Sequence, residues 1–297
     1  MEIRTVCRHS LEYPGRLEKL GDPPKELRVC GHLTDVPLVA IVGTRHPDNR
    51  MIRFTAELAS QLAARQIGIL SGGALGIDTA AHRGALDAGG ITVAVLGSGF
   101  DFIFPEKNRS LFMEIEKNDG AVISEFPDHT PPARWTFPKR NRLVAAMASA
   151  VVVVQAPGRS GSMITARISK EIGVPLGAVP GAPTDSLSAG CNQLIRGGAT
   201  LISNADDVIN LLGCDTYCQQ LDLPGTVKQG MESTEKMPLG LSSEETRIWN
   251  LLTHDAIHID DIALETKLPM RVVSAAVLNM ELFGLIEDSG GKRFIRK

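Results

Sequence analysis

Between residues 38 and 45 the chain reads Leu38-Val39-Ala40-Ile41-Val42-Gly43-Thr44-Arg45, five apolar residues that end at a glycine. A short, continuous apolar run bounded by a turn residue is typical of a strand covered on both faces. Similar runs follow at 67–70, 92–96, 121–123, 151–154 and 176–179. They alternate with stretches that carry apolar residues at helical spacing, at 53–64, 78–88, 111–116, 142–148, 164–172 and 205–212. This alternation predicts an extended Rossmann-like α/β fold with a doubly wound, mostly parallel sheet.

The 297 residues are enough for one large domain and one small one. Residues 1–37 contain Tyr13-Pro14-Gly15 and Asp22-Pro23-Pro24, which indicate an N-terminal lead-in packed on the Rossmann-like domain of residues 38–213. Residues 214–240, with scattered Gly and Pro, are interpreted as a linker. Residues 241–297 show three helical patterns and then two strand-like pieces, which predicts a small C-terminal winged-helix domain.

The net charge of −3 argues against a protein that binds nucleic acid over most of its surface, because such proteins usually carry an excess of basic residues. Any DNA site must therefore be local. The five cysteines include no C-x-x-C pair, although Cys214 and Cys218 have helical spacing, and we predict neither a disulfide framework nor a metal site. No apolar stretch is long enough to span a membrane, and the N-terminus lacks a signal-like apolar region, so we expect a cytoplasmic protein.

Three glycine-rich loops follow predicted strands: Gly43-Thr44-Arg45, Ser71-Gly72-Gly73-Ala74-Leu75-Gly76 and Gly158-Arg159-Ser160-Gly161-Ser162. Ligands of open parallel sheets bind at this edge, where free backbone N–H groups suit phosphate oxygens. Tight strand-to-helix turns also need glycine, so one such loop alone would mean little. None of them completes G-x-G-x-x-G or G-K-[ST], so we predict no NAD or ATP and no other cofactor.

Residues 134–142 read Arg134-Trp135-Thr136-Phe137-Pro138-Lys139-Arg140-Asn141-Arg142, basic side chains interleaved with two aromatic ones. Aromatic faces stack on bases of any sequence, while Arg and Lys follow the backbone, so the segment favours single-stranded nucleic acid. The alternative is a structural one, in which Arg140 or Arg142 neutralises a carboxylate such as Glu125 and Phe137 belongs to the core.

Catalytic patterns are weak. Asp78 and His82 are four residues apart on a predicted helix and could form a base or ligand pair, but a helix cap and a structural hydrogen bond explain them equally well. Ser160 and Ser162 have no identifiable base. We predict no catalytic residue. The winged-helix region has more acidic than basic residues, which favours a protein-binding role over sequence-specific duplex reading.

The motifs together resemble the DprA/Smf family of DNA-processing proteins. The resemblance is carried by Ile41-Val42-Gly43-Thr44-Arg45, residues 71–82, Val95-Leu96-Gly97-Ser98-Gly99, Ile123-Ser124-Glu125-Phe126-Pro127, Phe137-Pro138-Lys139-Arg140-Asn141-Arg142, Ser160-Gly161-Ser162-Met163-Ile164-Thr165-Ala166 and Val179-Pro180-Gly181.

This resemblance implies a homodimeric, non-catalytic protein that binds single-stranded DNA and loads the RecA recombinase onto incoming strands in natural transformation, displacing single-strand-binding protein. Some members of the family carry an N-terminal SAM-like domain, which we do not expect in this chain. The DNA-binding residues expected from the loops, the basic segment and the resemblance are Gly43, Thr44, Arg45, Ser71, Gly72, Gly73, Phe137, Lys139, Arg140, Asn141, Arg142, Ser160, Gly161 and Ser162.

The chain departs from the family pattern at several positions. Leu75 and Val174 stand where the family usually has arginine, Phe104 where it has tyrosine, and Gln155 where it has glutamate. We expect the two lost cations to weaken or narrow the DNA groove. There are two alternative functions. One is a protein-binding adaptor with reduced DNA affinity. The other is a nucleotide phosphoribohydrolase, which needs an acidic residue soon after its glycine loop, whereas the next carboxylate in this chain is Glu171.

Overall fold

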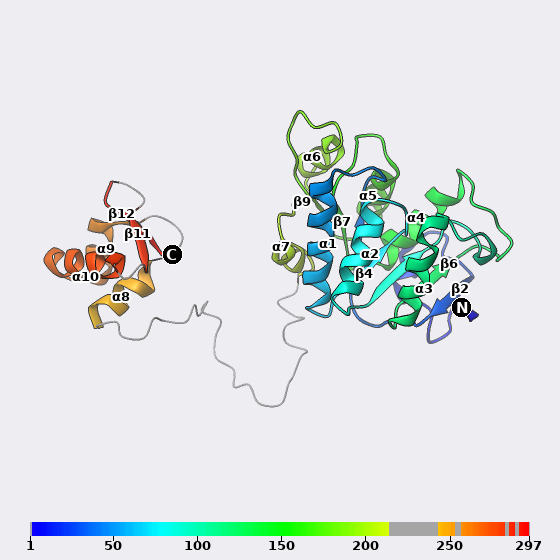
Figure 1. Ribbon diagram of the computed structural model, residues 1–297, viewed down its shortest axis with the longest axis horizontal. Coiled ribbons are helices and arrows are strands. Elements are labelled where there is room, and N and C mark those ends of the chain that lie inside the picture. The colour runs from blue at the N-terminus through cyan, green and yellow to red at the C-terminus, as the bar shows by residue number, and fades with distance from the viewer. Residues whose placement is uncertain (1, 214–242, 253–256, 283–284, 289–290, 297) are drawn as a thin grey trace. The chain divides into compact units, whose positions relative to one another are not determined.

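The computed structural model describes residues 2–213, 243–252, 257–282, 285–288 and 291–296 (Figure 1). The chain divides into two compact units, Met1–Asp222 and Leu223–Lys297, and each is described by itself. The predicted linker at 214–240 lies outside the described residues, as do Cys214 and Cys218. Among the residues that are described, no helix is both long and apolar enough to cross a membrane.

The first unit is built on one nine-stranded sheet, in which β2 alone runs opposite to the other strands, so that its pairs with β1 and β6 are antiparallel and the remaining pairs are parallel. The doubly wound, mostly parallel sheet predicted from the apolar runs is therefore confirmed. In spatial order the strands are β1 (Ile3–Cys7), β2 (Glu26–Gly31), β6 (Ala121–Ser124), β5 (Thr92–Val95), β4 (Gly68–Ser71), β3 (Leu38–Val42), β7 (Ala150–Val153), β8 (Leu176–Ala178) and β9 (Thr200–Leu201).

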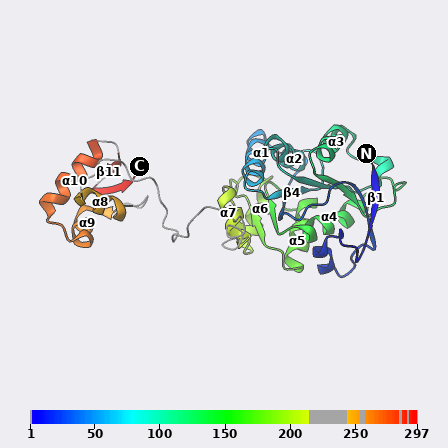
Figure 2. The same ribbon diagram turned by 90° about the horizontal axis from the view of Figure 1, so that it is seen from below.

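Helices cover both faces of this sheet, with α1, α2 and α3 on one side and α4 and α5 on the other (Figure 2). Strand β3 shows why both faces must be covered: Val39 and Ile41 pack into the cluster under α1 and α2, while Leu38, Ala40 and Val42 pack into the cluster under α4 and α5. The helices are α1 (Asn49–Ala63), α2 (Ile77–Asp87), α3 (Arg109–Lys117), α4 (Thr136–Met147), α5 (Gly161–Glu171), α6 (Ala189–Arg196) and α7 (Ala205–Leu211).

The N-terminal lead-in is part of the sheet itself. Strand β2 pairs antiparallel with β6, and β1 pairs antiparallel with β2. Between them a short 3-10 helix, Gly15–Lys19, buries Leu17, and the hydroxyl of Tyr13 donates to the carbonyl of Pro24 at 2.7 Å. The turn residues that punctuate this segment thus separate two strands of the large sheet.

Helix α4 begins at Thr136, six residues before the start predicted from apolar spacing. The hydroxyl of Thr136 bonds to Ala133 at the helix entry, and Pro138 is tolerated because the first turn has no intrahelical partner for its missing N–H. The basic segment is therefore helical, which decides where each of its side chains points. Helix α6 and the short strand β9 were not predicted.

The strand order places a topological switch point at β3. This strand pairs with β4 on one side and β7 on the other, and the chain leaves β3 and β7 toward helices on opposite faces of the sheet. A crevice outside the carboxyl ends of such strands is where open α/β sheets bind their ligands.

The second unit has the order predicted for a winged helix, with one additional strand. It consists of α8 (Ser243–Leu251), β10 (Ile257–His258), α9 (Ile259–Thr266), α10 (Met270–Leu282), β11 (Ile286–Asp288) and β12 (Arg293–Arg296), and its sheet order is β10-β12-β11. Ile248, Trp249, Val273, Met280 and Phe294 are central to a separate core. The chain turns between α9 and α10 at Lys267, whose backbone is left-handed.

Candidate functional site

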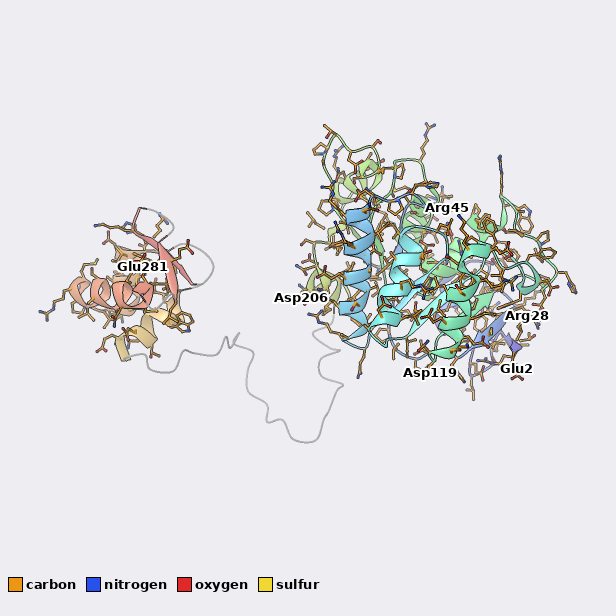
Figure 3. The ribbon with its side chains drawn as sticks, viewed as in Figure 1. Glu2, Arg28, Arg45, Asp119, Asp206 and Glu281 are labelled. Atoms are coloured by element: carbon orange, nitrogen blue, oxygen red, sulfur yellow. The ribbon has the colours of Figure 1, made fainter. Side chains whose placement is uncertain are left out.

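A pocket of about 480 Å³ opens at the carboxyl edge of the sheet, at the switch point. It is bounded by the loop after β3, the loop after β7, and the first turns of α4 and α5. Figure 3 shows Arg45 at this rim, and Asp119, which precedes β6, at the opposite rim. The volume lies within the range of about 300 to 1,000 Å³ that is common for small-molecule sites.

Most of the residues predicted from the sequence meet in this pocket. Its lining includes Gly43, Thr44, Arg45, Gly72, Phe137, Arg140, Asn141, Ser160, Gly161 and Ser162. Four predicted residues, Ser71, Gly73, Lys139 and Arg142, are not part of the lining. Arg134, His46 and Asp78 line the pocket as well, although they were not among the expected DNA-binding residues.

A cation and an aromatic ring, those of Arg45 and Phe137, form one wall of the pocket mouth. The guanidinium of Arg45 lies 5.3 Å from the centroid of the Phe137 ring, a cation–π distance, and the ring of Phe104 lies 5.8 Å from the same ring. Phe137 can approach the loop after β5 because Gly97 has no side chain there; a Cβ on it would lie 2.7 Å from the ring. Arg45 itself is exposed, so its charge faces solvent.

Arg140 forms the floor of the pocket and is only 5% exposed. Its guanidinium donates to the carbonyl oxygens of Gly72 and Val95, at the ends of β4 and β5, and its Nε donates to Asn141 at 3.1 Å. Burial lowers the pKa of Arg140 to about 10. A Cβ on Gly72 would lie 2.7 Å from this guanidinium, so the glycine is required for the close approach. Arg140 thus ties α4 to two strands.

Asp78 and His82 are explained by structural roles. The carboxylate of Asp78 accepts from the backbone N–H of Ala74 at 3.2 Å; burial raises its pKa, against the opposing effect of Arg140. His82 Nδ1 lies 2.7 Å from the hydroxyl of Thr92, and burial lowers the pKa of His82 to about 3. Because Thr92 donates to Ile69, the neutral imidazole must be the donor to Thr92.

The N-terminus of α5 forms another part of the pocket lining. The hydroxyl of Ser162 donates to the carbonyl of Gly43 at 2.8 Å, and Asn141 donates to the carbonyl of Gly161 at 3.1 Å, so α5 is linked to β3 and α4. Ser160 Oγ is buried with no hydrogen-bond partner among the described residues. The positive end of an 11-residue helix therefore faces the pocket, an arrangement that suits an anionic ligand.

Lys139 and Arg142 lie on the other side of α4. Arg142 pairs with the buried carboxylate of Glu125 and donates to the carbonyl of Asp22, while the Lys139 amine lies 3.8 Å from the same carboxylate. Burial raises the pKa of Glu125, and the two cations oppose that rise. The structural alternative considered for this segment is therefore confirmed for Arg142.

Ser71 and Gly73 also turn away from the pocket. The hydroxyl of Ser71 is fully buried and donates to the carbonyl of Ile41 at 2.6 Å, which links β4 to β3. Gly73 has a left-handed backbone and lies against the ring of Phe112. Both residues shape the loop that brings Gly72 to the pocket.

The two family positions at which arginine is replaced differ in location. Leu75 lines a small cavity beside Phe104 and Phe137, next to the main pocket. Val174 is 3% exposed, packs in the core and precedes β8 at its amino end, the edge opposite the pocket. Val174 is thus distant from the pocket, whereas Leu75 adjoins it, and the expected effect of both replacements on the DNA groove stays a prediction.

Comparison with protein families gives two matches along the chain. Residues 4–213 match the model described as DNA recombination-mediator protein A, and residues 232–292 match the DprA winged helix domain.

Curated relatives agree with these matches. The chain is 33% identical over 312 residues to Protein Smf of Synechocystis sp., covering 96% of this chain and 78% of that protein. It is 40% identical over 255 residues to the putative DNA processing protein DprA of Mycobacterium tuberculosis, covering 85% of this chain and 63% of the relative's length.

Two solved structures share the fold at substantial identity. DNA processing protein A from Streptococcus pneumoniae superposes with a TM-score of 0.66 at 35% identity, covering 70% of this chain and 74% of that one. DNA processing protein A from Helicobacter pylori, described for its single-stranded DNA binding mode, superposes with a TM-score of 0.64 at 34% identity, covering 72% and 97% respectively.

Proposed function

The chain belongs to the DNA recombination-mediator protein A family, also known as DprA/Smf, and on that premise we propose that it binds single-stranded DNA in the pocket at the switch point of its sheet. The observation that carries the proposal is the presence of two kinds of binding surface in one pocket lining. The Arg45–Phe137 wall offers a ring on which a base can stack, and the α5 N-terminus offers N–H groups and a positive dipole for a phosphate.

This arrangement favours a single strand over a duplex. Stacking on Phe137 needs an exposed base face, which a duplex hides, and it tolerates any base. Binding should therefore be independent of sequence and sensitive to salt. The Helicobacter pylori relative, whose structure is described for single-stranded DNA binding, supports the same ligand class.

The proposed role involves no catalysis. Among the described residues, Asp78 is the carboxylate that lines the pocket, and it is held by Ala74 and faces Arg140. Glu171, the first carboxylate after the glycine loop, lies at the far end of α5 and pairs with Arg167 at 3.5 Å. A phosphoribohydrolase would need an acid in the pocket that is free to act on the ligand.

On the basis of family membership, we further propose that a homodimer of the chain passes the bound strand to the RecA recombinase during DNA uptake in the cytoplasm, displacing single-strand-binding protein. The winged-helix unit then serves as a protein contact. The acidic residues in the first turn of α9, Asp260 and Asp261, would repel a phosphate backbone and are consistent with that role.

The proposal is tested by fluorescence anisotropy with a labelled homopolymeric single strand and the matching duplex, each titrated at several salt concentrations. We expect preferential, salt-sensitive binding to the single strand, lost in Arg45→Glu. Arg167→Glu is the matched control, because Arg167 is an exposed arginine outside the pocket. If neither DNA binds, the protein-adaptor function replaces this proposal. If Arg45→Glu binds as the wild type does, the pocket is not the site.

A further inference from the structure

The face of α4 that points away from the pocket carries an exposed tryptophan. The side chain of Trp135 is 59% exposed and stands edge-on to the buried ring of Phe126, with 5.7 Å between the ring centroids. The amine of Lys139 lies 5.3 Å from the centroid of the same Phe126 ring. We call Trp135, Phe126 and Lys139 the outer platform. Trp135 and Lys139 are four residues apart, so they share one side of the helix entry.

The outer platform is close in sequence and structure to the pocket but separate from it. Arg134, which precedes Trp135, lines the pocket, and Phe137, two residues later, forms its wall. None of the three platform residues is part of the pocket lining. A strand that leaves the pocket at Arg134 therefore meets Trp135 next, at the other side of the same helix N-terminus.

The chemistry of the platform suits a nucleotide. An exposed indole offers a broad face for stacking, and its geometry is fixed here by Phe126. Lys139 and Arg142 share one carboxylate, that of Glu125, whose side chain is only 3% exposed, so this group carries one net positive charge. The Lys139 side chain is 45% exposed, and its amine is placed to meet a phosphate.

We propose that the outer platform is a second stacking site for the same single strand, with Trp135 as the base-binding face and Lys139 as the phosphate contact. The inference rests on the proposed function of the pocket. Long strands then contact the outer platform as well as the pocket, whereas short strands contact the pocket alone.

The test measures affinity for thymidine homopolymers of about 4 and about 16 nucleotides, which span the site sizes typical of single-strand binders. Trp135→Ala should weaken binding of the longer strand by about 5- to 100-fold, the effect expected from losing one stacked base, and leave the shorter strand unaffected. Trp135→Phe should restore most of the loss. Met113→Ala on α3, another exposed apolar residue, is the control and should change neither affinity.

Intrinsic fluorescence gives a second readout that does not depend on affinity. The chain has two tryptophans, and Trp249 is buried in the second unit. Saturation with the longer strand should quench the wild-type emission and leave that of Trp135→Phe unchanged, and the shorter strand should quench neither.

The outcomes separate the two proposals. If the wild type binds both strands but Trp135→Ala binds the longer one normally and no quenching occurs, the outer platform is overturned while the pocket stands. If the wild type binds neither strand, the proposed function fails, and the platform fails with it.

Discussion

The two faces of helix α4 carry similar residues but have different roles, since one lines the pocket and the other pairs with Glu125. On the inner face, Arg134, Phe137 and Asn141 line the pocket, with Arg140 as its floor. On the outer face, Lys139 and Arg142 converge on Glu125. This difference shows that basic residues close together in sequence need not lie on one surface, because a helix distributes neighbouring residues around its axis.

The strongest contrast is between Arg140 and Lys139, which are adjacent in sequence. Arg140 is buried and holds two carbonyl groups, whereas Lys139 is exposed and pairs loosely. Arg140→Met should lower the free energy of unfolding by about 3 kcal/mol, because it leaves those carbonyls and the buried Asp78 without their cation. Lys139→Met should cost less than about 1 kcal/mol. Urea unfolding measures both.

Equal costs for the two variants would contradict the assignment of Arg140 to the interior. The double variant Asp78→Asn with Arg140→Met gives a further check. If Asp78 and Arg140 are coupled, the double variant loses less stability than the two single variants added together.

A second buried titratable side chain, His82 of α2, lies close enough to Arg140 to be affected by its charge. Its pKa is lowered to about 3 in the folded protein, below the usual 6.5, so the unfolded chain takes up the proton first. The contribution of the neutral His82 to the free energy of unfolding is fully present above pH 6.5. It is lost as the pH falls toward 3, by about 2 kcal/mol at pH 5. Unfolding measured between pH 7 and 4.5 should show this loss, and His82→Asn should flatten the curve. A slope unchanged in the variant would show that other groups cause it.

The aromatic side chain on the inner face should contribute affinity rather than charge. Phe137→Ala is expected to weaken single-strand binding by about 1 to 3 kcal/mol, equally on all homopolymers, since base stacking is largely independent of sequence. The measurement is anisotropy on thymidine and adenine strands at one salt concentration. Phe137→Tyr keeps the ring and should bind nearly as the wild type does. A loss confined to one base would indicate a hydrogen-bonding pocket instead.

Arg142 offers the sharpest way to break the comparison, because it was expected to bind DNA and the structure turns it toward Glu125. Arg142→Ala should lower the free energy of unfolding by about 1 to 3 kcal/mol, since the buried carboxylate loses its main partner. It should leave the affinity for a short strand of about 4 nucleotides, seated in the pocket alone, unchanged. Parallel unfolding and anisotropy measurements test both parts. A clear loss of affinity in a folded variant would restore Arg142 to the DNA site.

Much of this arrangement could be predicted from the sequence. Apolar runs such as residues 38–42 identify buried parallel strands, and the glycine loops after β3 and β7 point to the edge where the pocket lies. These features depend on local pattern and on general rules of α/β topology, so one sequence is sufficient to recognise them.

The orientation of the basic segment could not be predicted as well. The apolar spacing placed the start of this helix at Arg142, whereas the contact between Thr136 and Ala133 marks a start at Thr136. Had the helix been placed at Thr136, the spacing of Arg134, Phe137 and Asn141 would have separated the inner face from the outer one. The burial of Arg140 carries no signal in the sequence, since arginine is usually exposed and its partners are backbone carbonyls distant along the chain.

The central claim, that the strand is held by the inner face of α4 and the loop after β3, is tested most directly by salt dependence. The logarithm of the affinity for a strand of about 4 nucleotides, which occupies the pocket alone, is plotted against the logarithm of salt concentration for the wild type, Arg45→Ala and Arg142→Ala. The account predicts that the slope becomes shallower by about 0.7 in Arg45→Ala, one phosphate contact, and does not change in Arg142→Ala. A slope that changes in Arg142→Ala and not in Arg45→Ala would contradict it.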